Sequence, residues 1–485
     1  MQAVKLKPRG DHGDGDSDGD GDHGDGYGDR AAALTALRDA FGARVLTSDA
    51  IREQYGKDES HHPSSPPDAV LRPRDKFEVQ RIVQTCAQHR MPVVAFGVGT
   101  SLEGNVAALA GGICIDSSEM KQIIQVNAED FDVVVQPGVT RRQLNQHLKG
   151  SGLFFPIDPG ADATLGGMAA TRASGTNAVR YGTMRENVLN IEAVLADGSM
   201  IRTAKRARKS AAGYDLTGLL VGSEGTLAVF TELTVRLHPA PESMASAVCV
   251  FETIKGAVDT VIQLIQCGIP VARVELCDAL TIKSFNMYSG TDFIESPTLL
   301  LEFHGSDAGV REQAEATQEL AHDNGGGEFK WTQNTEERNK MWRARHDAAY
   351  SGKRLHPKGR IWATDVCVPI SRLADCIEAT RRDIEESKLL APLVGHVGDG
   401  NFHLLLLVDH DDPQEVARAE ALHRRMVMRA LDMDGTCTGE HGIGQGKIDF
   451  LKLEHGAAVS TMCAVKQALD PHNIMNPGKI FDQKS

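Results

Sequence analysis

The sequence contains no pair of cysteines at C-x-x-C spacing, although nine cysteines are spread along its 485 residues. An iron–sulfur cluster therefore has no recognisable set of ligands, and no regular disulfide framework is visible. Scattered cysteines of this kind are typical of reduced thiols in an intracellular protein.

Long apolar runs and clusters of positive charge are also missing. No apolar stretch approaches the ~18 residues that a membrane-spanning helix needs, and the mean hydropathy is -0.26. The formal net charge of -14 opposes a phosphate-rich partner, and the chain has no stripe of lysine and arginine with interleaved aromatic residues. We therefore expect neither a membrane span nor a nucleic acid partner.

Residues 10–29 read GDHGDGDSDGDGDHGDGYGD and are dominated by Asp and Gly. Asp14, Asp16 and Asp18 imitate the start of an EF-hand calcium loop, but no helices are expected beside them and the usual glutamate is missing. A segment with so few apolar residues cannot form a core. We therefore expect a disordered acidic tail over 1–30. Such a start also differs from an Arg-rich transit peptide and from a secretory signal.

Helix and strand patterns mix along the rest of the chain, which predicts an α+β protein. The length leaves room for about three domains of ~150 residues. The first half contains short strands with glycine turns and a hairpin at Asp197-Gly198. From about residue 241, apolar strands alternate with helices, as in an open sheet covered on one side. The expected strands, with their glycine turns, are 92–99, 112–116, 132–139, 246–252 and 298–305, and the expected helices are 31–42, 79–89, 255–266, 309–323 and 412–433.

Three segments rich in glycine and other small residues favour a nucleotide cofactor. They are FGVGTSLEG (96–104), PIDPGADATLGGMAATRASGTNAVRYG (156–182) and VGSEGTL (221–227). Closely spaced glycines allow backbone N–H groups to approach phosphate oxygens. An ordinary Rossmann site would need a glycine at position 102, where this chain has Leu102. Each segment alone could be a tight connection, but together they favour a flat cofactor with a pyrophosphate.

The segment GHVGDGNFH, residues 395–403, places two histidines symmetrically about an Asp-Gly pair. Asp-Gly is a strong signal for a two-residue hairpin turn, because glycine adopts a positive φ at no cost. With Asp399 and Gly400 in the turn, His396 would lie directly opposite His403 on one face. Opposed Cβ atoms are about 4.5–5.5 Å apart, so one metal ion could bridge the two rings. The pattern alone also allows two ordinary hydrogen-bonded histidines.

Taken in order, these segments and the C-terminal GTCTGEHGIG and LDPHNIMNPGKIF resemble the FAD-linked D-2-hydroxyacid dehydrogenases. These are flavoproteins of the vanillyl-alcohol-oxidase type, and the cytochrome-linked D-lactate dehydrogenases are the closest branch. The resemblance implies a two-part FAD-binding domain over 31–240 and an α+β cap domain with an antiparallel sheet over 241–455. Residues 456–485 would return to the first domain.

The resemblance also implies how FAD is held. The first glycine segment contains no histidine, so FAD would be bound non-covalently. The residues expected to contact it are Gly97, Val98, Gly99, Thr100, Ser101, Gly104, Pro159, Gly160, Thr164, Gly166, Gly167, Ser174, Gly175, Asn177, Tyr181, Gly182, Glu224, Gly225 and Asn476.

By the same resemblance, His396, His403 and Glu440 bind a divalent ion, Zn²⁺ or Mn²⁺. Two imidazoles and a carboxylate leave coordination positions open for a substrate oxygen. Such an ion would bind the hydroxyl and carboxylate of a 2-hydroxyacid as a Lewis acid. His441 is the expected general base, because imidazole titrates near neutral pH. Alternatively, His441 completes the metal shell and Glu440 or a water is the base.

In MWRARHDAAY, Arg345 corresponds to the arginine that grips the substrate carboxylate in this family, and Arg343 is the alternative. A planar guanidinium suits that role. Relatives specific for D-2-hydroxyglutarate carry a lysine just before the aspartate-containing strand, where this chain has Ala363. The difference favours a monocarboxylate, although a basic residue within 353–358 could reach the same place.

The resemblance therefore implies FAD-dependent oxidation of a D-2-hydroxy monocarboxylic acid, D-lactate to pyruvate first, with D-2-hydroxyglutarate and glycolate as alternatives. Electrons would pass to cytochrome c, a quinone or an electron-transfer flavoprotein. A flavin-dependent transferase, a metal hydrolase and a non-catalytic flavin-binding subunit remain alternatives. A homodimer is the candidate assembly. The expected location is the cytoplasm of a bacterium or the mitochondrion of a eukaryote.

Overall fold

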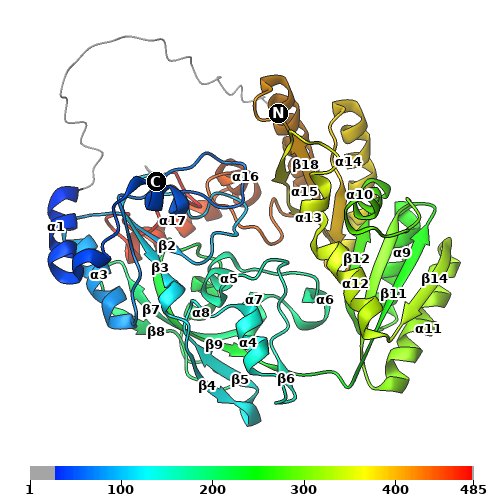
Figure 1. Cartoon of the computed structure of the whole chain (residues 1–485), viewed down its shortest axis with the longest axis horizontal. Helices are drawn as coiled ribbons and strands as arrows, with labels where there is room; N and C mark the ends of the chain where they lie inside the picture. The colour runs from blue at the N-terminus through cyan, green and yellow to red at the C-terminus, as the bar shows by residue number, and fades with distance from the viewer. Residues whose placement is uncertain (1–27, 483–485) are drawn as a thin grey trace.

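The computed structural model describes residues 28–482, and the acidic segment with its calcium-loop pattern lies outside them. Two blocks lie side by side (Figure 1), one built on two smaller sheets and the other on a single large sheet. The prediction of an α+β protein is confirmed. Within the described residues, no helix combines the length and apolar character that crossing a membrane requires.

The first block begins with a parallel three-stranded sheet covered by helices α1 and α3. Helix α3 spans Lys76–Gln88 and buries Val79, Ile82, Val83 and Cys86 on one face, the spacing of an amphipathic helix. The helix starts three residues before residue 79, its predicted first residue, because the side chain of Asp75 accepts hydrogen bonds from the backbone N–H groups of Phe77 and Glu78. The sheet order is β1 (Ala69–Leu71), β3 (Ile113–Asp116), β2 (Val93–Phe96), and the flanking helices are α1 (Arg30–Phe41) and α2 (Asp49–Arg52).

The second sheet of this block is antiparallel. The predicted hairpin at Asp197-Gly198 is confirmed, and Gly198 has a φ of 79°. The sheet order is β4 (Ile123–Asn127), β5 (Asp132–Val135), β9 (Ala228–Arg236), β7 (Val188–Leu195), β8 (Met200–Arg202), with a separate pair β6 (Leu153–Phe154) and β10 (His238–Pro239). The helices around it are α4 (Arg141–His147), α5 (Leu165–Thr171), α6 (Ala178–Tyr181), α7 (Met184–Asn187) and α8 (Leu216–Leu220).

The second block, which we call the cap, contains an eight-stranded sheet whose neighbours all pair antiparallel, as predicted. Its order is β14 (Gly326–Thr332), β11 (Ser243–Phe251), β13 (Thr298–Gly305), β12 (Val271–Cys277), β17 (Leu393–His396), β18 (Asn401–Val408), β15 (Arg360–Ala363), and β16 (Val366–Cys367) also pairs with β18.

The expectation that helices cover only one face of this sheet is wrong. Leu299 and Leu301 of β13 pack into the core formed with α9 (Ile254–Gln266), α11 (Asp307–Asp323), α14 (Leu373–Ser387) and α15 (Pro413–Asp432). Leu300 points to the opposite face, into a core with α10 (Ala279–Ser289), α12 (Thr335–His346) and α13 (Ala348–Gly352). Both faces are buried, which explains why the strand is continuously apolar.

The register of the histidine hairpin also differs from the prediction. His396 of β17 pairs with Asn401 of β18, so the turn has four residues, 397–400, rather than two. The turn is held from outside, because the N–H of Val368 donates to the carbonyl of Gly400 at 3.0 Å. His403 lies two residues beyond Asn401, so the imidazoles still share one face, but they are diagonal neighbours.

After the cap, the chain returns to the first block through α16 (Ile448–His455) and α17 (Ala458–Leu469). The segment after α17 lies along β2. Val93 donates its N–H to the carbonyl of Ile474 at 2.7 Å and accepts from the N–H of Asn476 at 2.8 Å. The end of the chain is thereby placed beside the first glycine segment, which follows β2.

Candidate active site

A cavity of about 180 Å³ lies in the first block at its border with the cap, and all three glycine segments line it. The segments approach closely: a Cβ on Gly97 would lie 2.4 Å from the hydroxyl oxygen of Thr164. Only glycine at position 97 allows this approach. The residues expected to bind FAD that line the cavity are Gly97, Val98, Gly99, Thr100, Ser101, Pro159, Thr164, Gly166, Gly167, Ser174, Glu224 and Gly225.

The other residues expected to bind FAD lie outside this lining. Asn177 accepts a hydrogen bond from Arg273 Nε at 2.8 Å, and the hydroxyl of Tyr181 lies 2.8 Å from His304 Nδ1. Both therefore contact the cap. Asn476 donates to the carbonyl oxygens of Asn105 and Glu224 at 2.9 and 2.7 Å, and so joins two of the loops. The remaining positions outside the lining are Gly104, Gly160, Gly175 and Gly182.

The chemistry of the lining fits FAD. Hydroxyl groups come from Thr100, Ser101, Thr164 and Ser174, and among the described residues no lysine or arginine lines the cavity. Phosphate oxygens would therefore be bound by hydroxyl and backbone N–H donors. Small and apolar residues make up most of the remaining wall, as a flat ring system requires.

The same cavity reaches Glu440 and His441 of the cap. Glu440 lies beside the histidine hairpin: its Oε1 is 3.3 Å from Nε2 of His396 and 3.3 Å from Nε2 of His403. The ring centres of the two histidines are 5.4 Å apart. Two imidazole nitrogens and a carboxylate therefore converge on one point at the end of the cavity.

Each of these histidines is oriented by a partner on its other nitrogen. His396 donates from Nδ1 to Glu275 Oε1 at 2.6 Å, and His403 donates from Nδ1 to the carbonyl of Thr364 at 3.0 Å. With Nδ1 as the donor, Nε2 of a neutral imidazole carries the lone pair, which is the arrangement that metal-bound histidines use; here His396 Nε2 contacts Glu440 Oε1 at 3.3 Å. His403 Nε2 and Glu440 Oε2 are buried and make no hydrogen bond. The donor set therefore fits a divalent cation.

Asp365, between β15 and β16, holds the loop that carries Glu440 and His441. Its Oδ2 accepts from the backbone N–H groups of both residues, at 2.9 and 3.0 Å, and from the hydroxyl of Thr438 at 2.7 Å. Its Oδ1 accepts from Asn401 Nδ2 at 2.7 Å. Asp365 also forms a possible ligand group with His403 and His441, but its oxygens are already occupied by these donors.

His441 lies over the hairpin, with its ring stacked on that of His403 at 4.9 Å. Burial lowers the pKa of His441 to about 4, so the ring is neutral near pH 7 and able to accept a proton. Its Nδ1 is buried without a hydrogen-bond partner. The position is compatible with a general base and also with a metal ligand.

Arg345 is buried on α12, and Arg343 is exposed on the same helix. Glu275 binds Arg345 through Nε and Nη2 at 2.9 and 2.6 Å, which leaves Nη1 for another acceptor. Because Glu275 also binds His396, one carboxylate connects the arginine to the metal-type cluster. Burial by itself would raise the pKa of Glu275. The charges of His396 and Arg345 lower the pKa by more than burial raises it, so the pKa of Glu275 lies below its ordinary value.

Glu224 fastens the cap loop to the glycine segments. It accepts from the backbone N–H groups of Ile443 and Gly444 at 2.7 and 2.8 Å and from Asn105 Nδ2 at 2.5 Å. The sequence analysis did not identify this role, nor those of Glu275 and Asp365. An acidic residue within a largely apolar segment, as in VARVELC and ATDVCV, is a signal that could have identified the last two.

Two family models match the chain. One, described as FAD linked oxidases, C-terminal domain, matches residues 240–480, and the other, FAD binding domain, matches residues 67–204. The chain is 51% identical to "Probable D-lactate dehydrogenase, mitochondrial" of Danio rerio, over 90% of this chain and 89% of that protein. It is 45% identical to "D-lactate dehydrogenase (cytochrome), mitochondrial" of Arabidopsis thaliana, over 90% of this chain and 78% of that protein.

More distant similarities agree with the fold. The chain is 34% identical to "Glycolate oxidase subunit GlcD" of Bacillus subtilis, over 90% of this chain and 93% of that protein. Among solved structures, p-cresol methylhydroxylase superposes with a TM-score of 0.75 at 19% identity, covering 93% of this chain and 97% of that chain. The 4-ethylphenol oxidase of Gulosibacter chungangensis superposes with a TM-score of 0.75 at 17% identity, covering 94% of this chain and 98% of that chain. The expected vanillyl-alcohol-oxidase type of fold is thereby confirmed.

Proposed function

This chain belongs to the family of FAD-linked oxidases, and from that premise we propose that it oxidises a D-2-hydroxy monocarboxylic acid, D-lactate to pyruvate. It is an FAD-dependent oxidoreductase. The substrate class is supported by the names of relatives that are 45–51% identical. The observation that carries the proposal is that one cavity joins the glycine segments to Glu440 and His441.

The residues of the cap would hold the substrate at the end of this cavity. When bound, FAD supplies a hydride acceptor, and a divalent ion held by His396, His403 and Glu440 supplies a Lewis acid. Arg345 would bind the substrate carboxylate through Nη1, the end that Glu275 leaves free. Such a contact fixes the position of C2 relative to the flavin site.

His441 would take the hydroxyl proton at Nδ1, which has no hydrogen-bond partner among residues 28–482. Its lowered pKa keeps the ring neutral near pH 7, as a base requires. The C2 hydrogen leaves with two electrons, and the product is the 2-oxoacid. Glu224 and Asp365 hold the loop that carries His441 from its two sides, so the base has a fixed position.

Anaerobic mixing of the purified protein with hydroxyacids tests this proposal. D-Lactate should bleach the visible flavin band, whereas L-lactate, D-2-hydroxyglutarate and glycolate should not. Chelation should abolish the bleaching, and Zn²⁺ or Mn²⁺ should restore it. His403→Asn should remove the metal response, and His322→Asn, at an exposed histidine, serves as the matched control.

Other outcomes would change the conclusion in definite ways. A yellow protein that no hydroxyacid bleaches would favour a transferase or a non-catalytic flavin subunit. Bleaching by glycolate or D-2-hydroxyglutarate instead of D-lactate would correct the substrate. Bleaching that survives complete metal removal would refute the proposed role of a divalent ion as a Lewis acid. A colourless protein would contradict the assignment of the cavity to FAD.

For the electron acceptor we favour a cytochrome over a quinone or an electron-transfer flavoprotein, because the name of a close relative includes cytochrome. The same names support a mitochondrial location if the chain is eukaryotic. Reduced protein mixed with cytochrome c should reoxidise in a single stopped-flow trace; failure with cytochrome c and success with a quinone would reverse this preference. The homodimer stays a prediction.

A further inference from the structure

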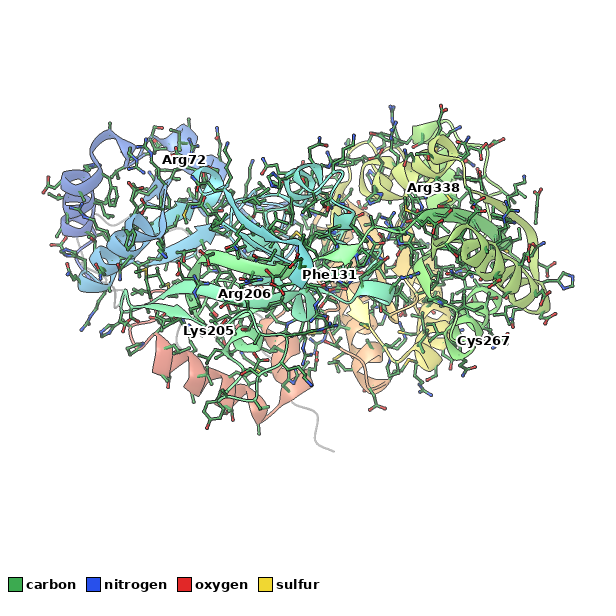
Figure 2. The ribbon with its side chains drawn as sticks, turned by 90° about the horizontal axis from the view of Figure 1, so that it is seen from below. Arg72, Phe131, Lys205, Arg206, Cys267 and Arg338 are labelled. Carbon is green, nitrogen blue, oxygen red and sulfur yellow. The ribbon has the colours of Figure 1, made fainter. Side chains whose placement is uncertain are left out.

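A second hollow lies on the cap, between α12 and strands β11 and β14. It is an open groove of about 230 Å³, and its walls include the apolar side chains of Phe293, Trp331 and Met341. Arg338 of α12 also lines it, and Figure 2 labels this residue. None of the residues to which we assign a role in the reaction lines this groove.

Arg338 is a buried arginine, and two of its guanidinium nitrogens make no hydrogen bond among the described residues. Its side chain is 6% exposed, and its Nε and Nη1 are buried without a hydrogen bond. Among the described residues, no carboxylate forms an ion pair with it. A buried N–H group without an acceptor is unfavourable, so the guanidinium favours an additional acceptor at this point.

The nearby carboxylate, Glu302, is close enough for the charge of Arg338 to help lower the pKa of Glu302, but the two side chains form no hydrogen bond among the described residues. Glu302 accepts from Ser246 Oγ at 3.1 Å and lies 2.9 Å from His304 Nε2 and 3.4 Å from Arg273 Nε. Its acceptor positions are thus directed at other groups. Lys330 and Lys340 add positive charge at the rim of the groove, whereas Asp292 and Glu337 offset part of it.

The groove is separate from the substrate site. Arg345 follows Arg338 by seven residues on α12, which corresponds to roughly 10 Å along the helix axis. Both side chains face the sheet, but one small anion cannot contact both. Glu275 already binds Arg345, whereas no carboxylate among the described residues lies within ion-pair distance of Arg338.

We propose that this groove binds an organic carboxylate with an apolar body. The carboxylate would accept a hydrogen bond from the guanidinium of Arg338, which lines the groove, and the opposite charges strengthen such a bond. The apolar body would lie against Phe293, Trp331 and Met341. A ligand with this combination fits the groove better than inorganic phosphate, which would leave the apolar wall exposed to water.

Calorimetric titration of the FAD-loaded protein with hexanoate tests the proposal. Hexanoate should bind, and Arg338→Gln should weaken this binding at least tenfold. Arg343→Gln, at an exposed arginine of the same helix, should bind hexanoate as the unmodified protein does. Arg345→Gln should also retain the binding, which separates the groove from the substrate site. Arg338→Gln should leave the KM for D-lactate unchanged.

Two further ligands and a second readout keep the test decisive. Hexanamide, which is uncharged, should not bind, and inorganic phosphate should not displace hexanoate. If Arg338→Gln bound hexanoate as tightly as the unmodified protein does, the assignment of the site to Arg338 would be overturned. Displacement of hexanoate by phosphate would overturn the proposal that the ligand is an organic carboxylate. Hexanoate should also change the tryptophan fluorescence of the unmodified protein, and Trp331→Phe should remove this change. Absence of a fluorescence change would refute contact with the apolar wall even if Arg338→Gln failed to fold.

Discussion

Replacing Glu275 by glutamine tests whether one buried carboxylate organises both the arginine and the metal-type cluster. Glu275 is fully buried. Its Oε1 accepts from His396 at 2.6 Å, and its Oε2 accepts from Arg345 at 2.9 Å. Glutamine has the same shape but only one acceptor oxygen, so its NH₂ group must face either the imidazole N–H or the guanidinium. One of the two donors therefore loses its acceptor.

The expected magnitudes follow from these two contacts. Breaking a buried ion pair by removing one partner costs about 3–5 kcal/mol of the free energy of unfolding. Losing the partner that orients a metal-bound histidine lowers metal affinity by about 10–100-fold. Glu275→Gln should therefore lower both stability and metal affinity, and it should raise the KM for the hydroxyacid because Arg345 loses its orientation.

Denaturant unfolding and competition with a chelator measure the two effects separately. Glu328→Gln is the matched control, because the side chain of Glu328 is 59% exposed and pairs only with Lys330 in the described part of the chain. An exposed pair contributes about 0–1 kcal/mol, and metal affinity should not change. A Glu275→Gln protein that keeps its metal within threefold of the unmodified affinity would refute the idea that Glu275 orients His396.

Three further substitutions follow from the geometry. Burial raises the pKa of Asp158, but His346 and two arginines lower it to below its ordinary value, so Asp158→Asn should destabilise the protein at pH 7. A carboxyl group whose pKa is lowered by folding contributes stability that is lost on acidification. The difference in the free energy of unfolding between Asp158→Asn and the unmodified protein should therefore shrink below about pH 4. A constant difference from pH 7 to pH 3 would contradict this account. His441→Ala should lower kcat by about 10²–10⁴-fold, and unchanged turnover in rapid-mixing assays would remove His441 as the base. Arg345→Ala should mainly raise KM for D-lactate, and an unaltered KM would assign the carboxylate to Arg343.

The local features of the fold could be predicted from the sequence because neighbouring residues determine them. The apolar spacing from Val79 to Cys86 predicted α3, and Asp197-Gly198 predicted a hairpin that the structure contains. The start of α3 lies three residues before the predicted start, because Asp75 caps the helix. The cap sheet was expected to be antiparallel, but its coverage was not predictable, because a short apolar run does not say how many faces are buried.

The histidine hairpin shows where local reasoning ends. Asp399-Gly400 is a two-residue turn signal, yet the turn has four residues because β16 and Val368 hold it from a distant part of the chain. The shared face of His396 and His403 was predicted, since it depends only on the alternation of side chains along strands. Their exact pairing was not, since it depends on tertiary contacts.

The sequence by itself determined the composition of the glycine segments, the histidine pair and the family resemblance. Only the tertiary structure decided which groups meet. Glu275 is separated from His396 by 121 residues, and Glu224 from Gly444 by 220, and no local pattern links such positions. The burial of Arg338 was equally unpredictable, because burial and the absence of hydrogen bonds at its Nε and Nη1 exist only once the chain has folded.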